Sequence, residues 1–215
     1  MFESEKEAVL RTCGDLVENG VVRNTGSAGN VSVRPQEDDD RIVITPSKIR
    51  YDTMASEDVL VLDRKGEIIE SPAGHDPSSE TPMHLQIHDA IETARAVVHS
   101  HPKVTTGLAA HTDRIPSTHI EQAYFVGDHV PVIDYVPTGS EEMGEAVSAA
   151  LQNAPAVVIR HHGLITVGED LPEALERTFS IEANATNYYY AATSGEAVEM
   201  DDDDIHHLQN PDADV

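Results

Sequence analysis

The sequence predicts an α/β protein in which one mixed sheet is covered by helices on both faces. Two observations support this prediction: short β-branched runs of strand length recur along the chain, and amphipathic stretches of helical period lie unevenly between them. A third is that neither an internal repeat nor a linker divides the chain, whose 215 residues suit one compact domain. We expect that domain to span residues 1–195.

The first third of the chain is predicted to hold one helix and four short strands. Residues 4–19 carry apolar side chains at helical spacing, and the small residues 25–30 (TGSAGN) form a turn before the first strand. The strands alternate apolar with polar residues or are rich in valine and isoleucine, and they are expected at 30–34, 41–45, 59–63 and 67–69.

The rest of the chain is predicted to combine helices with buried strands. Thr81 and Pro82 start a helix that runs to about Ala94, because threonine caps helix N-termini and proline is tolerated in the first turn. The later helices are expected at 103–111, 140–152 and 171–192, and the later strands at 96–100, 130–136, 156–160 and 164–168. After Ser194 the chain is small, acidic and aperiodic, so residues 196–215 are expected to form a disordered tail.

The charge balance excludes two classes of partner. The chain has 39 acidic and 14 basic residues, a net charge of −25. Such a surface repels nucleic acid and anionic membranes, and no apolar run is long enough to span a bilayer. The strand and helix patterns argue against disorder, so the acidic excess indicates a halophilic protein, adapted to salt that screens the self-repulsion.

The single cysteine indicates a reducing compartment. Cys13 has no partner for an internal disulfide, and its place in an amphipathic stretch is typical of a small buried residue rather than of a nucleophile. The N-terminal residues MFESEKEAVLRTC lack the layout of a secretion signal. We therefore expect a cytoplasmic protein.

Two strands that end in histidines are the first sign of a metal site. His99 and His101 form an H-x-H pair at the end of a β-branched strand, and alternation places both on one face. The pair alone is weak, because 12 histidines give roughly 0.7 such pairs by chance. A second β-branched run ends in His161 and His162, of which only one is expected to be a ligand because neighbouring strand residues face opposite ways.

Glu80 provides a possible fourth ligand. It lies at the start of a predicted helix, where the helix dipole stabilises any carboxylate, so an ordinary helix-terminal acid is the alternative interpretation. Three neutral imidazoles and one carboxylate form a workable four-coordinate set for zinc or another divalent ion.

Small polar residues at strand and helix ends favour phosphate binding. Hydroxyls, exposed backbone N–H groups and helix N-termini are the groups that bind a phosphate dianion. Each such residue is individually typical of an ordinary turn or cap, and the prediction depends on their flanking the metal residues. They are Ser27, Gly29, Asn30, Ser47, Lys48, Ser78 and Ser79.

Five segments, in this order, resemble the class II aldolase and adducin family, and most closely its fuculose-phosphate aldolases. They cover roughly residues 20–190 and read TGSAGNVSVR, RIVITPSKIRYDTM, DPSSETPMHLQIHDA, AVVHSHP and RHHGLITVGEDLPEAL. The resemblance implies a three-layer α/β/α sandwich with one mixed, largely antiparallel sheet. It also implies a homotetramer with active sites between subunits.

The resemblance further implies a reaction and a role for each residue. The reaction would be cleavage of a ketose 1-phosphate to dihydroxyacetone phosphate and an aldehyde, with one divalent metal per subunit, expected to be Zn²⁺. Glu80 would be a displaceable ligand and the general acid/base, beside metal ligands His99, His101 and His162. The phosphate pocket would comprise Ser27, Gly29, Asn30, Ser47, Ser78 and Ser79.

Three departures from the family pattern leave the aldehyde half of the substrate open. Ile120 follows the histidine of IPSTHI, where the fuculose-phosphate aldolases have a tyrosine, and the C-terminal tail contains no tyrosine. Lys48 stands where the family has a glycine and either adds a cation to the phosphate pocket or points outward. Glu121 is a hypothetical replacement group on the aldehyde side.

Several alternatives share parts of these patterns. Pentulose-phosphate 4-epimerases and methylthioribulose-phosphate dehydratases of the same family share the metal site, although epimerases typically carry aspartate at the place of Glu80. A non-catalytic adducin-like interaction module would be expected to lack the histidines. A cupin oxygenase would have a glutamate shortly after the H-x-H pair, and residues 102–110 contain none.

Overall fold

The computed structural model of the chain describes residues 1–26 and 28–211. Their strands form one nine-stranded sheet in the order β4-β3-β2-β1-β5-β9-β8-β7-β6. Neighbouring strands are antiparallel except for the parallel pair β7–β8, which confirms the mixed, largely antiparallel sheet. The strands are β1 (Asn30–Val33), β2 (Arg41–Ile44), β3 (Leu60–Asp63), β4 (Ile68–Glu70), β5 (Ala96–Ser100), β6 (Arg114–Pro116), β7 (His129–Ile133), β8 (Ala156–Ile159) and β9 (Gly163–Gly168).

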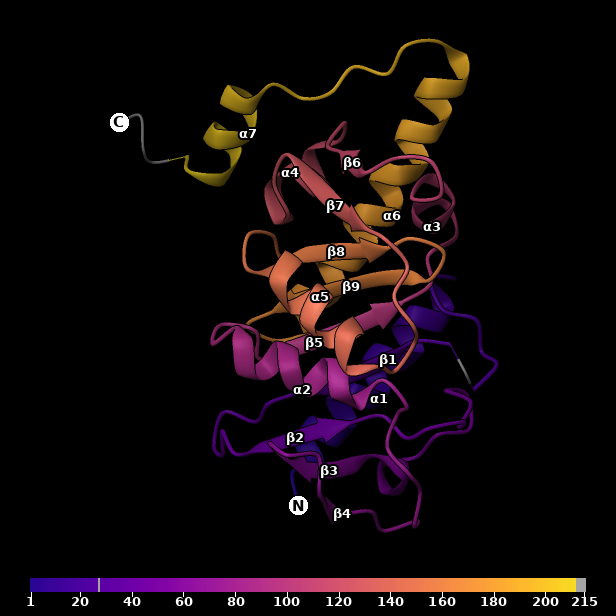
Figure 1. Cartoon of the computed structure of the whole chain (residues 1–215), viewed down its shortest axis with the longest axis vertical. Helices are drawn as coiled ribbons and strands as arrows, with labels where there is room; N and C mark the ends of the chain where they lie inside the picture. The colour runs from indigo at the N-terminus through magenta and orange to yellow at the C-terminus, as the bar shows by residue number, and fades with distance from the viewer. Residues whose placement is uncertain (27, 212–215) are drawn as a thin grey trace.

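Helices cover both faces of this sheet, with α2 and α5 in front and α1 and α6 behind it in Figure 1. Alternation along β5 explains the layers: Val97 packs in the core under α2 and α5, whereas Val98 packs under α1. The predicted three-layer α/β/α sandwich is confirmed. The helices are α1 (Glu3–Glu18), a 3₁₀ turn η1 (Ser56–Asp58), α2 (Thr81–Ala90), α3 (Lys103–Leu108), α4 (Ile120–Phe125), α5 (Glu141–Leu151), α6 (Leu171–Ser194) and α7 (Asp202–Gln209).

The structure differs from the prediction mainly in short elements. β6 and α4 were not predicted: three and six residues carry a weak periodic signal, although β4 and α3, of the same lengths, were predicted. The helix expected to end near Ala94 ends at Ala90, and its N-cap is Glu80 rather than Thr81. This shift matters because it places the Glu80 carboxylate at the helix entrance.

The C-terminal segment contains a helix where the sequence predicted a disordered tail. Asp201 caps α7 by accepting a hydrogen bond from the backbone N–H of Asp203. Ile205 is 5% exposed, so its buried side chain holds this helix against the protein. One apolar residue in an acidic stretch shows no helical period, so the sequence does not predict the helix. The Gln209 side chain donates to the carbonyl of Ala123 in α4 at 3.1 Å. Residues 212–215 of the predicted tail lie outside the described residues.

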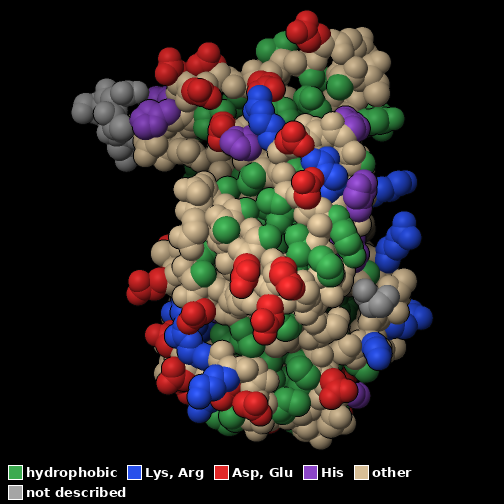
Figure 2. All heavy atoms as spheres, viewed as in Figure 1, with side chains coloured by type: hydrophobic (Ala, Val, Ile, Leu, Met, Phe, Trp, Pro, Cys, Tyr) green, Lys and Arg blue, Asp and Glu red, His purple; other side chains and the backbone are tan. Residues whose placement is uncertain are grey.

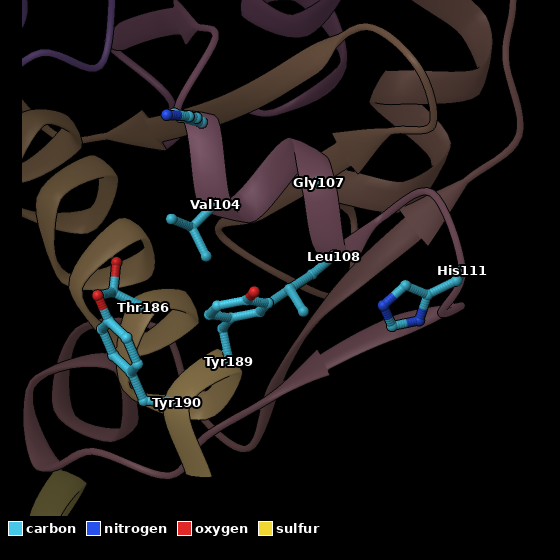
Figure 3. A pocket seen from close by; sticks show the side chains of 8 residues that line it. Val104, Gly107, Leu108, His111, Thr186, Tyr189 and Tyr190 are labelled. Atoms are coloured by element: carbon cyan, nitrogen blue, oxygen red, sulfur yellow. The ribbon is translucent and has the colours of Figure 1, made fainter. Parts of the chain in front are cut away.

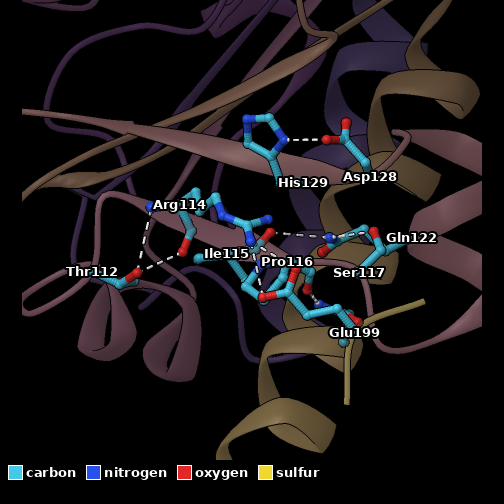
Figure 4. Close-up of polar contacts among 10 residues, drawn as sticks. Thr112, Arg114, Ile115, Pro116, Ser117, Gln122, Asp128, His129 and Glu199 are labelled. Carbon is cyan, nitrogen blue, oxygen red and sulfur yellow. Dashed lines mark hydrogen bonds and ion pairs between the residues drawn. The ribbon is translucent and has the colours of Figure 1, made fainter. Parts of the chain in front are cut away.

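Polar contacts also tie the segment before α7 to the sheet edge. Arg114 of β6 forms an ion pair with Glu199 at 2.7 Å, which Figure 4 shows beside the Ser117–Gln122 hydrogen bond. The backbone N–H of Met200 donates to the carbonyl of Ser117 at 2.8 Å. These contacts are between residues far apart in sequence, so local composition does not predict them.

The surface matches the acidic composition. Figure 2 shows Asp and Glu side chains spread over the visible face, with the fewer Lys and Arg side chains gathered mainly along its edges. Among the described residues, no helix has the length and apolarity needed to cross a bilayer.

Candidate metal and active site

The register of the sheet brings the first two histidines to one face. His99 is fully buried in β5, and its Nδ1 lies 3.1 Å from the carbonyl oxygen of Leu164 on β9. Because a carbonyl only accepts, Nδ1 carries the proton, which leaves a lone pair on His99 Nε2. His101 directs its Nε2 to within 3.0 Å of that nitrogen.

A tight turn between β8 and β9 delivers the third histidine. His161 has a left-handed backbone, with φ of 62°, and its side chain is exposed, so the turn directs His162 inward instead. The candidate ligand atoms of His99, His101 and His162 lie within 4.8 Å of one another. Gly163 makes this approach possible, because a Cβ there would lie 2.7 Å from the His99 ring and 2.6 Å from the His101 ring.

Glu80 faces this histidine cluster from α2. Its Oε2 lies 3.2 Å from His99 Nε2, and its Oε1 lies 3.1 Å from His162 Nε2. Burial alone would raise the pKa of Glu80, but the neighbouring imidazoles of His99 and His162 and the hydrogen bond from Asn30 hold it well below the usual value. The carboxylate is therefore ionised at neutral pH.

This donor set fits a divalent cation. Nitrogen lone pairs and a carboxylate converge on one point, and among the described residues the buried Glu80 Oε1 has no hydrogen-bond donor. Burial lowers the pKa of His99, and it lowers that of His101 to about 3, so both imidazoles are neutral at pH 7. Neutral imidazole is the protonation state that binds a metal ion.

Asn30 lies beside His99 across the β1–β5 pair. The sequence predicted that Asn30 binds phosphate, but its side chain contacts other protein groups. Its side-chain nitrogen donates to Glu80 Oε2 at 2.6 Å, and its side-chain oxygen lies 2.5 Å from His84 Nε2. The amide is therefore occupied on both sides by Glu80 and His84.

A cavity of about 200 Å³ adjoins the histidine cluster and joins most of the predicted phosphate residues to it. A β-bridge between Pro46 and Pro77 holds two of its loops together, and the backbone N–H of Ser78 donates to the carbonyl of Thr45 at 3.2 Å. Of the predicted set, Ser27 lies outside the described residues. The others line the cavity together with Lys48: Gly29, Asn30, Ser47, Ser78 and Ser79.

Besides Pro46, two lining residues were missed by the sequence analysis, Gly26 and Thr138. Both belong to Thr-Gly-Ser tripeptides, at 25–27 and 138–140, and this repeat was the available signal. Ile120 and Glu121, considered for the aldehyde side, do not line the cavity within this chain.

A larger cavity, of about 520 Å³, lies between α3 and α6. Figure 3 shows Val104 and Leu108 of α3 next to Tyr189 and Tyr190 of α6 in its wall. Its lining contains neither a carboxylate nor any residue of the histidine cluster. The chemistry therefore favours the smaller cavity as the active site.

Comparisons with known proteins agree with this assignment. The class II aldolase and adducin N-terminal domain family matches residues 7–189. The L-fuculose phosphate aldolase of Haemophilus influenzae is 33% identical over 189 residues, 88% of this chain and 84% of the relative. A 5-methylthioribulose-1-phosphate/5-deoxyribulose-1-phosphate aldolase of Escherichia coli is 33% identical over 169 residues, 79% of this chain and 76% of the relative. A solved L-fuculose 1-phosphate aldolase superposes with a TM-score of 0.89 at 27% identity, covering 97% of this chain and 95% of the other. The chain therefore belongs to the class II aldolase and adducin family, as one of its aldolases, and is a lyase.

Proposed function

We propose that this protein cleaves a ketose 1-phosphate, similar to L-fuculose 1-phosphate, into dihydroxyacetone phosphate and an aldehyde. The observation that carries the proposal is that the candidate metal site and the candidate phosphate site open into the same cavity. The cluster of His99, His101 and His162 with Glu80 shares one cavity with the hydroxyl-bearing loops. Such a cavity accommodates a substrate with a carbonyl at one end and a phosphate at the other.

The metal in this proposal is one divalent ion per subunit, expected to be zinc. Held by His99, His101 and His162, it would stabilise the negative charge that develops on the substrate oxygens when the C3–C4 bond breaks. As the bond breaks, the C4 hydroxyl loses its proton and carbon C3 of the dihydroxyacetone-phosphate half gains one. The ionised Glu80 is the group placed to take up a proton and deliver it to C3. In the synthesis direction, Glu80 removes that proton.

The phosphate group is proposed to bind at the opposite end of the cavity. Ser47 comes from the loop after β2, and Ser78 and Ser79 precede α2, whose N-terminus favours an anion. Lys48 supplies a positive charge at the rim, and Gly29 contributes backbone to the lining. Ser27 is included in this phosphate pocket because of the resemblance to the class II aldolase family.

The relative from Escherichia coli supplies a second candidate substrate. By its name, that relative is an aldolase of 5-methylthioribulose 1-phosphate and 5-deoxyribulose 1-phosphate. Ile120 and the tail of this chain lack the tyrosines of the fuculose-phosphate aldolases, so the aldehyde half is the part of the substrate that differs. A 5-deoxypentulose 1-phosphate has the same dihydroxyacetone-phosphate half.

The proposal extends to the assembly and setting of the protein. We propose a homotetramer with active sites between subunits, supported by the exposed Tyr189 and Tyr190 beside the apolar α3–α6 cavity. The net charge of −25 supports a halophilic protein without nucleic-acid or membrane partners. The buried thiol of Cys13, whose pKa burial raises, supports a cytoplasmic setting.

A retro-aldol screen tests the proposal. The purified protein, loaded with Zn²⁺, is incubated with L-fuculose 1-phosphate, 5-deoxyribulose 1-phosphate and 5-methylthioribulose 1-phosphate, and dihydroxyacetone phosphate is measured with a coupled reductase. Release that stops with chelator and returns with Zn²⁺ supports the proposal. Interconversion of pentulose 5-phosphates, or loss of water from methylthioribulose 1-phosphate without cleavage, would instead identify an epimerase or a dehydratase.

A further inference from the structure

A line of buried polar side chains leads away from Glu80 between α2 and β1. Every fourth residue of α2 and every second residue of β1 contributes, so helix and strand periods match along the contact. The members are all at most 5% exposed, which is unusual for five polar side chains in succession. We call this line the polar seam: Glu80, His84, His88, Asn30 and Ser32.

Hydrogen-bond distances connect the polar seam from end to end. Asn30 links Glu80 to His84, at 2.6 Å and 2.5 Å. Ser32 Oγ lies 2.6 Å from His84 Nδ1 and 2.9 Å from His88 Nε2. At the far end, His88 Nδ1 lies 2.9 Å from the carbonyl oxygen of Ala94.

The proton positions follow in order from the hydrogen bond between Asn30 and Glu80. Because the carboxylate only accepts, the NH₂ group of Asn30 must face it, and the Asn30 oxygen must then accept a proton from His84 Nε2. Burial lowers the pKa of His84 to about 3, so this ring carries a single proton. His84 Nδ1 is therefore an acceptor for the hydroxyl proton of Ser32.

His88 is not needed for this order. Its Nδ1–H donates to the carbonyl of Ala94, and burial lowers its pKa to about 4, so its Nε2 has no proton to give. His88 Nε2, 2.9 Å from Ser32 Oγ, is therefore a second acceptor for the single hydroxyl proton of Ser32. It donates no proton to the seam, so the donor that fixes Asn30 is His84 Nε2 whichever ring the hydroxyl faces.

We infer that His84 is a positioning residue for the reaction: its Nε2–H holds the Asn30 amide so that the NH₂ group faces Glu80. Without this donor, the amide is free to turn its oxygen toward the carboxylate, and attraction at 2.6 Å becomes repulsion. Glu80 would then lose the orientation in which it faces His99 and His162. The kinetic part of this inference rests on the proposed function.

Two amide substitutions at position 84 distinguish the loss of the Nε2 hydrogen bond from a change in packing. The nitrogen of His84→Gln reaches the place of imidazole Nε2 and keeps the bond to Asn30. The nitrogen of His84→Asn reaches only the place of Nδ1, so Asn30 loses its donor. Both residues are polar and of similar size, and the same pair at the equally buried His88 is the matched control.

We expect kcat of His84→Asn to be about 10- to 100-fold below that of His84→Gln, as for other groups that orient metal ligands. KM should change by less than about twofold in either variant, because Ser47 and Ser78 are untouched. At position 88 the two variants should have equal kcat. Equal kcat for both variants at position 84, or an equal ratio at position 88, would overturn the inference.

A spectroscopic measurement does not depend on the substrate. The protein is loaded with Co²⁺, and the visible absorption spectrum and the Co²⁺ dissociation constant are recorded for wild type and all four variants. Only His84→Asn should change the spectrum and weaken binding, because only there does Glu80 lose its orientation. If wild type cleaves none of the sugar phosphates, the proposed function fails, but the Co²⁺ comparison still tests His84. An unchanged His84→Asn spectrum refutes the positioning role.

Discussion

Lys48 and His161 both adopt a left-handed backbone at the rim of the site, with φ of 62° in each. A side chain in this conformation costs roughly 1–2 kcal/mol relative to glycine. At His161 the cost accompanies the turn that directs His162 inward. At Lys48 it accompanies a cation in a cavity lined by hydroxyls, and in the proposed phosphate pocket attraction to the phosphate would offset this strain.

Lys48→Gly should therefore stabilise the fold and weaken substrate binding. Removing the strain should raise the free energy of unfolding by about 1 kcal/mol, or the melting temperature by about 2–4 °C. Loss of the cation should raise KM for a ketose 1-phosphate roughly three- to tenfold. Lys65→Gly, in an exposed turn outside this cavity, is the control and should leave KM unchanged. A lower melting temperature for Lys48→Gly contradicts the strain argument.

Glu80→Gln and His101→Ala should separate proton transfer from metal binding. Glutamine keeps the size of Glu80 and an oxygen ligand but cannot carry a proton, so we expect near-wild-type metal content and turnover reduced by about 10²-fold or more. His101→Ala removes a ligand and should lose both metal and activity. Metal analysis after dialysis, with kcat on the same samples, checks both variants. Full metal content in His101→Ala would falsify the ligand assignment.

At the scale of elements, α2 places neutral histidines against β1 in the core. His84 and His88 are fully buried along one face of the helix, and burial lowers the pKa of both. An unfolded histidine has a pKa near 6.5, so below that pH the unfolded chain binds more protons than the folded chain. The α2–β1 contact should consequently weaken as the pH falls.

His88→Leu should flatten this pH dependence. Between pH 6.5 and the folded-state pKa of about 4, His88 removes about 1.4 kcal/mol from the free energy of unfolding per pH unit. From pH 7 to pH 5, wild type should thus lose about 2 kcal/mol more than His88→Leu. Urea unfolding with chelator present measures both without a metal contribution. Equal losses in the two proteins would show that His88 is not neutral when folded.

At the scale of the whole molecule, the acidic surface sets the dependence on salt. A net charge of −25 produces repulsion in the folded state that salt screens. We expect the melting temperature to rise by roughly 5–10 °C between 0.1 M and 2 M NaCl. Scans in sucrose of equal osmolality, which does not screen charge, control for solvent exclusion. A melting temperature that is the same at both salt concentrations contradicts the halophilic interpretation.

The sequence by itself determined the layers, the long elements and the chemical types in the site. Valine-rich runs such as 96–100 and the periodic stretch 171–192 report burial directly, because their pattern repeats over several residues. His99 and Glu80 could be proposed as site residues because each ends or begins a strong element. The acidic surface charge likewise follows from the composition without a structure.

Where the residues by themselves left the choice open, tertiary structure decided which of these groups meet. The turn at His161 selects His162, the register Asn30↔His99 connects Asn30 to Glu80, and the Thr138 loop reaches the cavity from a distant part of the chain. The helix around Ile205 forms on a surface that α4 provides. Local patterns report how much each residue is buried, whereas convergence depends on strand register and turn geometry, which the packing of the whole chain fixes.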